Sequence, residues 1–431
     1  MQQHFRTSNF YILILMALFA SVQSQAQQAS RFRLMFNNDP SSEATIAWDS
    51  QGGEVEKYRV YYGPKDFGRN PLQYPVSTSP DAANSYKEMR NTFVRLKNLP
   101  PGEACYFVVS GNGFTSERFW FKTSPASPDQ RLNLVAGGDS RNNRDVRRNA
   151  NLLVSKLRPL AVFFGGDMTS IGSSSQWKEW FDDWQLSIAK DGRMFPLVVC
   201  RGNHEFSDEV IQNLFDTPKG VYYAMNFGGN LLRAYTLNTE ISIKGTQTQW
   251  LKNDLQQHAR QVHYRMVQYH KPMRPHVYRK VEGIDQYRYW AELFYKFRVD
   301  LAVECDAHTV KRTWPVKPRK KFSWLDVGRN QGFERDDLNG TVYVGEGCWG
   351  APLRRNNDNK RWTRASGMFN QFKWIFVDRQ KMEVRCVKVD NAPLVSSLTE
   401  DTLFDVPENL DIWKPENGET ILINCRTNPD K

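Results

Sequence analysis

The sequence predicts an α/β domain preceded by an all-β sandwich, in a chain of 431 residues. Between positions 30 and 124, short runs of alternating apolar and polar residues are separated by Gly, Pro, Asn and Asp, a pattern typical of antiparallel sandwiches. From 130 to 390, apolar strand patterns alternate with helical patterns, which indicates an α/β domain. The polar segment 391–431 is predicted to form an irregular C-terminal tail.

Residues 1–26 have the pattern of a signal peptide. Arg6 precedes an apolar run at 11–22, and small residues follow at 24–26, where cleavage is expected. The apolar run is shorter than the roughly 20 residues that cross a membrane as a helix. We therefore expect a secreted or periplasmic protein without a transmembrane anchor. The alternative is that this segment is retained as a membrane anchor.

The net charge of +11 favours acidic ligands without identifying a nucleic-acid surface. Basic residues are dispersed apart from short runs at 144–148 and 317–321, so the charge weakly supports a phosphate-bearing substrate and no dedicated nucleic-acid partner. The six cysteines form no Cys-x-x-Cys pair, which argues against a zinc-thiolate knuckle and leaves the disulfide pairing open. A bound metal must therefore use His, Asp and Asn side chains.

The elements can be placed approximately from their patterns. Strands of the sandwich are expected at 44–48, 58–62, 92–96, 105–109 and 118–122, followed by a linker rich in Ser and Pro at 123–129. The α/β domain is expected to have strands at 132–136, 161–164, 195–200, 264–269 and 301–304, helices at 144–157, 176–189, 247–258 and 286–297, and a hairpin at 374–377 and 382–389. Trp177, Trp180 and Trp184 have helical spacing and are expected in the core.

Five apolar strands each run into residues that can bind a metal. In chain order these residues are Asp139, Asp167, Asn203, His270, and the pair Asp306 and His308. Because ligand sites of open α/β folds lie at the carboxyl ends of strands, the side chains are expected to converge on one crevice. Each signal alone is weak, since a Gly-Asp after a strand is most often a turn or a helix cap. The prediction of a metal site therefore depends on the occurrence of all five strand-end signals in this order.

The order Gly-Asp, Gly-Asp, Gly-Asn-His-Glu, His and x-His resembles the signature of calcineurin-like metallophosphoesterases, and its most specific piece is the run 202–205. Trp48, the Tyr-Tyr-Gly at 61–63 and the aromatic run 119–121 resemble the fibronectin-III-like domain that precedes the catalytic domain of purple acid phosphatases. The resemblance covers roughly 30 to 390. It implies an αββα sandwich of two mixed sheets and metal-dependent hydrolysis of phosphoesters. Phosphomonoesters are the favoured substrates, and phosphodiesters are the open alternative.

The resemblance also implies a centre of two divalent or mixed-valence ions, of Fe, Mn or Zn, with a metal-bound hydroxide as the expected nucleophile. A carboxylate can bridge two cations about 3.5–4 Å apart, and imidazole or amide groups fill other positions without adding charge. Carried over by position, the first metal is held by Asp139, Asp167 and His308. The second metal is held by Asp167, Asn203, His270 and Asp306.

Three further residues are expected to act on the substrate or the site. His204 is suited to protonate the leaving alkoxide, and Glu205 to orient His204 or a water molecule. His276, six residues after His270, is expected either to face the substrate or to lie on the surface.

Three departures from the family pattern change the expected chemistry. Ser170 replaces the tyrosinate ligand of purple acid phosphatases, so no purple chromophore is expected. Arg141 replaces a residue that is a His ligand in many relatives; we expect it to bind phosphate oxygens, the alternative being a pairing with a surface acid such as Asp145. Asp306 replaces a His ligand, which favours harder metals or leaves a degenerate site.

The alternative function is a non-catalytic phosphate- or glycan-binding protein, in which the altered ligands no longer support hydrolysis.

Overall fold

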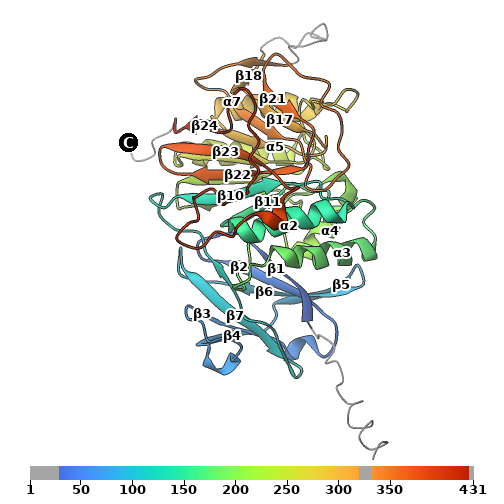
Figure 1. Cartoon of the computed structure of the whole chain (residues 1–431), viewed down its shortest axis with the longest axis vertical. Coiled ribbons are helices and arrows are strands. Elements are labelled where there is room, and N and C mark those ends of the chain that lie inside the picture. Colours follow the sequence, from blue (N-terminus) through green and yellow to red (C-terminus); the bar gives the residue numbers. More distant parts are fainter. Residues whose placement is uncertain (1–28, 320–331, 427–431) are drawn as a thin grey trace, which may run out of the picture.

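The computed structural model describes residues 29–319 and 332–426 (Figure 1). The predicted signal peptide, residues 1–26, lies outside the described residues, as does part of the basic run 317–321. Within the described ranges, no helix is both long enough and apolar enough to cross a membrane.

The N-terminal part, at the bottom of Figure 1, is all-β, as the sequence predicts. One of its layers contains β1 (Ala29–Met35), β2 (Ala44–Ser50), β5 (Ala82–Tyr86) and β6 (Met89–Leu96). The other contains β3 (Arg59–Gly63), β4 (Val76–Thr78), β7 (Ala104–Gly111), β8 (Phe114–Thr115) and β9 (Phe119–Lys122), with the short helical turns η1 (Val55–Lys57) and η2 (Pro71–Gln73) nearby in sequence. Trp48, Phe107 and Phe121 are fully buried in its core.

The two predicted domains share one sheet. β1 pairs in parallel with β12 (Leu197–Val199) of the second domain, with Met35 opposite Leu197. The result is a ten-stranded sheet in the order β24-β23-β22-β10-β11-β12-β1-β2-β6-β5. Pairing with β1 covers the edge of β12 that would otherwise be open. The expected linker is packed as well, because Ser124 is fully buried and its Oγ accepts a hydrogen bond from the Gly228 backbone N–H at 2.9 Å.

The second domain is an αββα sandwich of two mixed sheets. The first sheet contributes β10 (Leu132–Gly137), β11 (Ala161–Phe164), β12, β22 (Gln371–Val377), β23 (Lys381–Lys388) and β24 (Ile421–Asn424). The second sheet consists of β13 (Tyr223–Phe227), β14 (Leu232–Thr236), β15 (Tyr264–Gln268), β16 (Leu301–Val303), β20 (Val342–Gly345), β17 (Val310–Thr313) and β21 (Thr363–Gly367). A separate hairpin pairs β18 (Val316–Pro318) with β19 (Phe333–Arg335).

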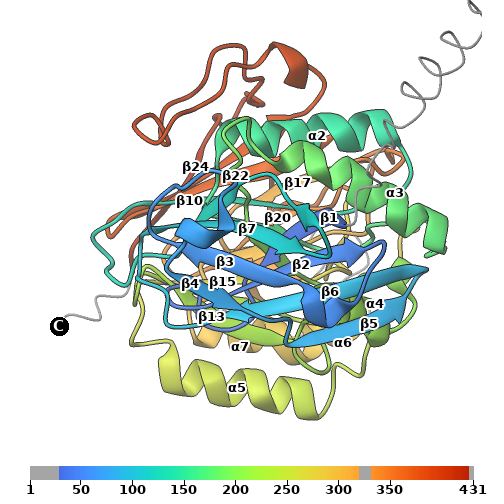
Figure 2. The ribbon, with the colours of Figure 1, turned by 90° about the horizontal axis from the view of Figure 1, so that it is seen from below.

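Helices flank the paired sheets on both sides (Figure 2). On one side lie α2 (Arg144–Leu157) and α3 (Ser174–Trp184), the latter continued by η3 (Gln185–Ser187). On the other lie α5 (Thr246–His258), α6 (Ile284–Gln286) and α7 (Glu292–Lys296), with the π-helical turn η5 (Tyr287–Ala291) between the last two. The remaining helical segments are η4 (Asn203–Glu205), α4 (Asp208–Phe215) and η6 (Ala392–Leu394).

Two of the hydrophobic clusters lie on opposite faces of the first sheet. The largest hydrophobic cluster includes Ala136 of β10 and Phe163 of β11 from the first sheet, and Met266 of β15 from the second, so it fills the space between the sheets. A second cluster packs the opposite face of the first sheet against α2 and α3. It contains Trp177, Trp180 and Trp184, each at most 2 % exposed, which confirms the prediction that these tryptophans belong to the core.

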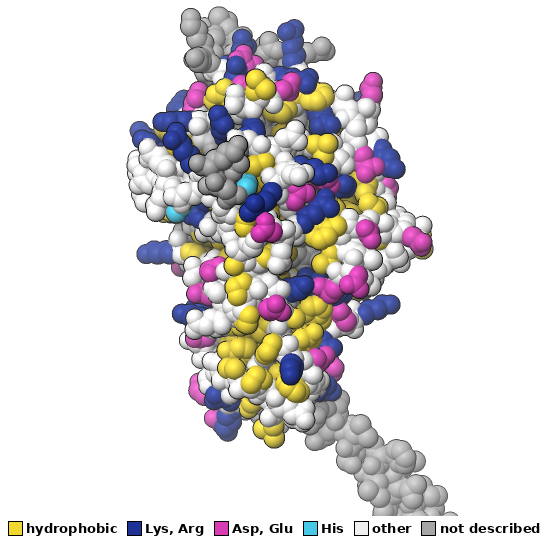
Figure 3. All heavy atoms as spheres, turned by 90° about the vertical axis from the view of Figure 1, so that its left-hand side faces the viewer, with side chains coloured by type: hydrophobic (Ala, Val, Ile, Leu, Met, Phe, Trp, Pro, Cys, Tyr) yellow, Lys and Arg dark blue, Asp and Glu magenta, His cyan; other side chains and the backbone are white. Residues whose placement is uncertain are grey.

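The topology brings the ends of the ligand-bearing strands together. β10, β11 and β12 run in parallel in one sheet, and β14, β15, β16 and β20 run in parallel in the other. The segment after residue 391, expected to be irregular, adds β24 to the first sheet beside β23. On the face shown in Figure 3, Lys and Arg side chains are spread among acidic ones, and hydrophobic side chains gather over the N-terminal sandwich.

Candidate metal centre

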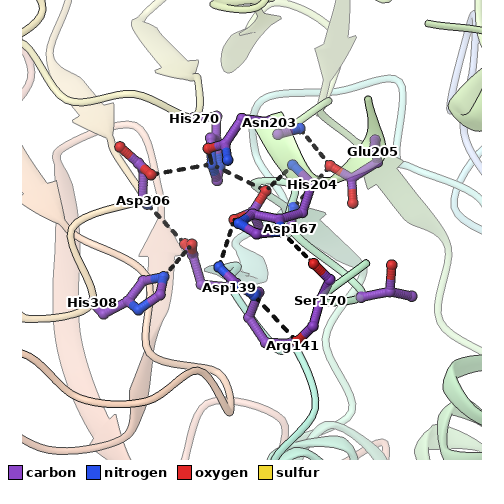
Figure 4. Close-up of polar contacts among 12 residues, drawn as sticks. Asp139, Arg141, Asp167, Ser170, Asn203, His204, Glu205, His270, Asp306 and His308 are labelled. Carbon is purple, nitrogen blue, oxygen red and sulfur yellow. Dashed lines mark hydrogen bonds and ion pairs between the residues drawn. The ribbon is translucent and has the colours of Figure 1, made fainter. Parts of the chain in front are cut away.

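Six side chains from the loops that follow five strands point toward one another (Figure 4). They are the predicted metal ligands: Asp139 after β10, Asp167 after β11, Asn203 after β12, His270 after β15, and Asp306 and His308 after β16. Asp139, Asp167 and His308 lie close enough to hold one ion, and so do Asp167, His270 and Asp306. Asp167 belongs to both groups, which is the arrangement that a bridging carboxylate requires.

The first metal position has two buried ligand atoms that face each other without hydrogen bonds. Asp139 Oδ1 lies 3.2 Å from His308 Nε2, and neither atom has a hydrogen-bond partner. His308 Nδ1–H donates to the Pro352 carbonyl at 3.0 Å, which leaves a lone pair on Nε2. Two buried acceptors in contact are costly unless a cation lies between them. These residues therefore fit a metal ion.

The second position has the same chemistry. His270 Nδ1–H donates to the Gly165 carbonyl at 2.9 Å, so Nε2 faces the site. His270 Nε2 lies 3.1 Å from Asn203 Oδ1, 3.3 Å from Asp167 Oδ1 and 3.8 Å from Asp306 Oδ1. Burial acts to lower the pKa of His270, but the carboxylates of Asp167 and Asp139 raise it well above its usual value. The field at this position therefore attracts positive charge.

Four of the six candidate ligands have positive backbone φ angles. These are 58° for Asp139, 55° for Asp167, 67° for Asp306 and 54° for His308. Such conformations cost of order 1–3 kcal/mol each in non-glycine residues and gather at functional sites. Hydrogen bonds fix the strained loops relative to one another. Asp306 N–H donates to Asp139 Oδ2 at 2.9 Å, and His204 N–H donates to Asp167 Oδ1 at 2.8 Å.

Two glycines allow the loops to approach the ligands closely. A Cβ atom added to Gly202 would lie 2.4 Å from Asp167 Oδ1. A Cβ atom added to Gly347, where φ is 86°, would lie 2.3 Å from Asp139 Oδ2. Any larger residue at either position would displace a candidate metal ligand.

Glu205 supports the site in a different way from the one expected. It was expected to orient His204 or a water molecule, but its fully buried carboxylate accepts backbone N–H groups. Glu205 Oε2 accepts from Asp167 at 2.9 Å and from Gly202 at 2.6 Å, and Oε1 accepts from Met168 at 2.9 Å. Glu205 therefore fixes the loop that carries the shared Asp167.

His204 and Arg141 both lie beside the shared carboxylate. His204 Nδ1–H donates to the Ser170 carbonyl, and His204 Nε2 lies 3.8 Å from Asp167 Oδ2. Arg141 Nη1 lies 3.4 Å from Asp167 Oδ2, and its Nε lies 3.4 Å from Ser170 Oγ. Arg147 holds the Arg141 backbone, because Arg147 Nη1 donates to the Arg141 carbonyl. The alternative pairing of Arg141 with Asp145 does not occur among the ion pairs of the described residues.

His276 lies in the interior of the protein. It is fully buried, and its Nε2 lies 2.6 Å from Thr363 Oγ1. Its ring packs edge-on against Trp362. Burial, together with the nearby Lys311, lowers its pKa well below the usual value. The alternative of a surface His276 is therefore wrong, and its role toward the substrate stays a prediction.

Two residues near the ligands were missed in the sequence. Lys280 Nζ lies 2.7 Å from Asp306 Oδ1, beside a hollow of about 720 Å³ bordered by Asn203, Asp306 and Lys280. No local pattern marks Lys280; only the replacement of a neutral His by Asp306 hints at a compensating cation. Cys305 lies near Asp139 and His270. The three side chains lie close enough together to hold an ion, and burial raises the pKa of the Cys305 thiol to about 12.

Known proteins share both parts of this architecture. Residues 29–123 match the family model of the purple acid phosphatase N-terminal domain, and residues 137–311 match that of the calcineurin-like phosphoesterases. A purple acid phosphatase, PPD1, from yellow lupin (Lupinus luteus) seeds is 17 % identical, with a TM-score of 0.70 over 92 % of this chain and 74 % of that chain. The structure of PhoD is 11 % identical, with a TM-score of 0.67 over 94 % of both chains. No curated protein sequence matches significantly.

Proposed function

Because this chain is a calcineurin-like metallophosphoesterase with the N-terminal domain of purple acid phosphatases, we propose that it hydrolyses phosphomonoesters at a centre of two metal ions. Metal-dependent hydrolysis of phosphoesters is the activity of the family. We add that this chain binds two ions and acts on monoesters. The observation that supports it most strongly is the pair of three-residue ligand groups that share Asp167.

The residues divide between the two metal positions as follows. Asp139 and His308 would hold the first ion, and Asn203, His270 and Asp306 the second, with Asp167 between them. When bound, such ions supply positive charge and activate water for attack on phosphorus. Carboxylate oxygens mixed with imidazole nitrogens suit Fe, Mn or Zn.

The remaining polar groups would act on the substrate. Arg141 presents a guanidinium beside Asp167, where it can donate two parallel hydrogen bonds to the non-bridging phosphoryl oxygens. His204, held through Nδ1 by the Ser170 carbonyl, turns Nε2 toward the same carboxylate. In the imidazolium form this nitrogen can donate a proton to the leaving oxygen. Secretion or export to the periplasm, predicted from residues 1–26, belongs to the same proposal.

The proposal is tested on the purified full chain by elemental analysis followed by a panel of phosphate monoesters and diesters. We expect two metal ions per chain and turnover that is lost on chelation and restored by adding metal. Faster turnover of monoesters than of diesters would support the substrate class. A metal-free protein that binds phosphate or glycans without hydrolysing any ester would contradict the proposal and support the non-catalytic alternative.

A further inference from the structure

Exposed apolar side chains gather around the candidate metal centre. Among the described residues, twelve large hydrophobic side chains are exposed, and four of them border the ligand cluster or the hollow beside it. These four are Ile171, Phe206, Val281 and Ile284. Exposed apolar groups that gather beside a polar site can mark contact with a ligand. Phe206 and Ile171 belong to the segments that contact His204, whereas Val281 and Ile284 line the separate hollow beside Asp306.

Phe206 is the most unusual of the four. It directly follows the Gly-Asn-His-Glu run, with φ at 59° and ψ at −33°, a conformation that is unfavourable for a bulky residue. Its side chain is 65 % exposed, so burial does not offset this strain. The strained backbone therefore holds an aromatic ring in solvent, at the edge of the site.

The ring of Phe206 lies close to His204 and to the loop at 170–172. Its centroid is 6.1 Å from that of His204, with the two planes at 65°. A Cβ atom added to Gly172 would lie 3.2 Å from the Phe206 ring. Phe206 therefore packs closely against the loop that follows Ser170.

Ile171, which is 67 % exposed, belongs to the same loop. The loop is fixed by hydrogen bonds, because Gln176 Oε1 accepts the backbone N–H groups of Ser170 at 3.1 Å and of Ile171 at 2.9 Å. Gly172 N–H donates to Thr169 Oγ1 at 3.1 Å. Ile171, Gly172 and Phe206 thus form a preorganised apolar rim beside His204.

We infer that this apolar rim binds the organic group of the phosphate ester, so that the enzyme prefers esters of aromatic or bulky apolar alcohols. The inference rests on the proposed function. A leaving oxygen that receives its proton from His204 places its carbon substituent within reach of Phe206, because the two rings are 6.1 Å apart. Aromatic substituents can pack edge-to-face or offset against this ring.

The test compares 2-naphthyl phosphate with glycerol phosphate as substrates of the metal-loaded enzyme. Loss of one aromatic contact corresponds to roughly three- to tenfold in binding. We expect Phe206→Ala to lower the ratio of kcat/KM for the naphthyl ester over the glycerol ester by about this factor, mainly through KM. Ile171→Ser should lower the same ratio by a smaller factor.

Two controls separate this rim from other apolar surfaces. Leu72→Ala removes a side chain that is 87 % exposed in the N-terminal domain, and Ile284→Ser changes the hollow beside Asp306. Both should keep the ratio of the wild type. If Ile284→Ser alone changes the ratio, the organic group binds in the hollow and the inference is overturned.

A stability measurement separates a binding role from a structural one. Phe206→Gly removes the strained conformation, so its unfolding temperature should equal or exceed that of the wild type even though the substrate ratio falls. A lower unfolding temperature with an unchanged ratio would show that Phe206 is structural. If the metal-loaded wild type hydrolyses neither ester, the proposed function fails, and the inference fails with it.

Discussion

Arg141 provides the sharpest test of how this site binds a phosphoryl group. Its guanidinium has five N–H donors, and its contacts with Asp167 and Ser170 are both long, at 3.4 Å. The side chain is 16 % exposed, and its backbone carbonyl is held by Arg147. Donor groups are therefore available at a fixed position, and we predict that two of them bind the substrate.

The expected loss follows from the hydrogen bonds that a substitution removes. A hydrogen bond to a charged group contributes about 1.5–3 kcal/mol. Arg141→Lys keeps the charge but loses one of two bonds, because an ammonium lacks the planar fork. It should lower kcat/KM by roughly ten- to hundredfold, and Arg141→Ala should lower it further. Lysine is the better comparison, since it keeps the positive charge beside Asp167.

The assay measures kcat/KM on a phosphate monoester, with the metal content of every variant determined alongside. Arg144→Lys is the matched control, because Arg144 makes two hydrogen bonds to Asp183, at 2.7 and 3.1 Å, in place of any contact with the ligands. It should change kcat/KM by less than about twofold. Unchanged kinetics of Arg141→Lys at full metal loading would refute phosphate binding. Loss of metal would instead assign Arg141 to the support of Asp167.

Four further predictions concern single residues. Asp167→Asn should lower turnover by several orders of magnitude, since it weakens both metal positions; activity within about threefold of wild type would rule out the shared ligand. With Ser170 at the tyrosinate position, the iron-loaded protein should lack a strong band above about 500 nm, and a band abolished by one Tyr substitution would contradict this. Lys280→Met should tighten metal binding by about tenfold in a calorimetric titration, because it removes a cation 2.7 Å from Asp306. Weaker binding would show that Lys280 does not compete with the metal for Asp306. Burial raises the pKa of Glu346 from 4.5 to about 7, so its contribution to stability is complete below pH 4.5 and is lost as the pH rises through 7. In urea unfolding, Glu346→Gln should reduce the fall of the unfolding free energy between pH 4.5 and 7. An unchanged fall would contradict the raised pKa of Glu346.

The sequence predicted the helix at 144–157 and the strand at 161–164 with the bounds that the structure shows. The helix has apolar residues at helical spacing, and the strand is a continuous apolar run that ends at Gly165 and Gly166. Pattern also located the six candidate ligands, because each follows an apolar strand and the strands are parallel. It did not locate β13, β14 or the strands between 310 and 367, where short runs carry mixed polar residues and pairing partners far away in the chain decide the structure.

For the candidate site, the sequence determined which side chains could bind metal, because each of them directly follows an apolar strand and therefore lies at the carboxyl end of the sheet. Only the tertiary structure decided what surrounds them. The position of Glu205 under the Asp167 loop, the burial of His276 and the exposure of Phe206 each depend on contacts with distant segments. The same holds for the pairing of β1 with β12, which joins residues 35 and 197. Periodicity reports which face of an element is apolar, but not which element covers that face.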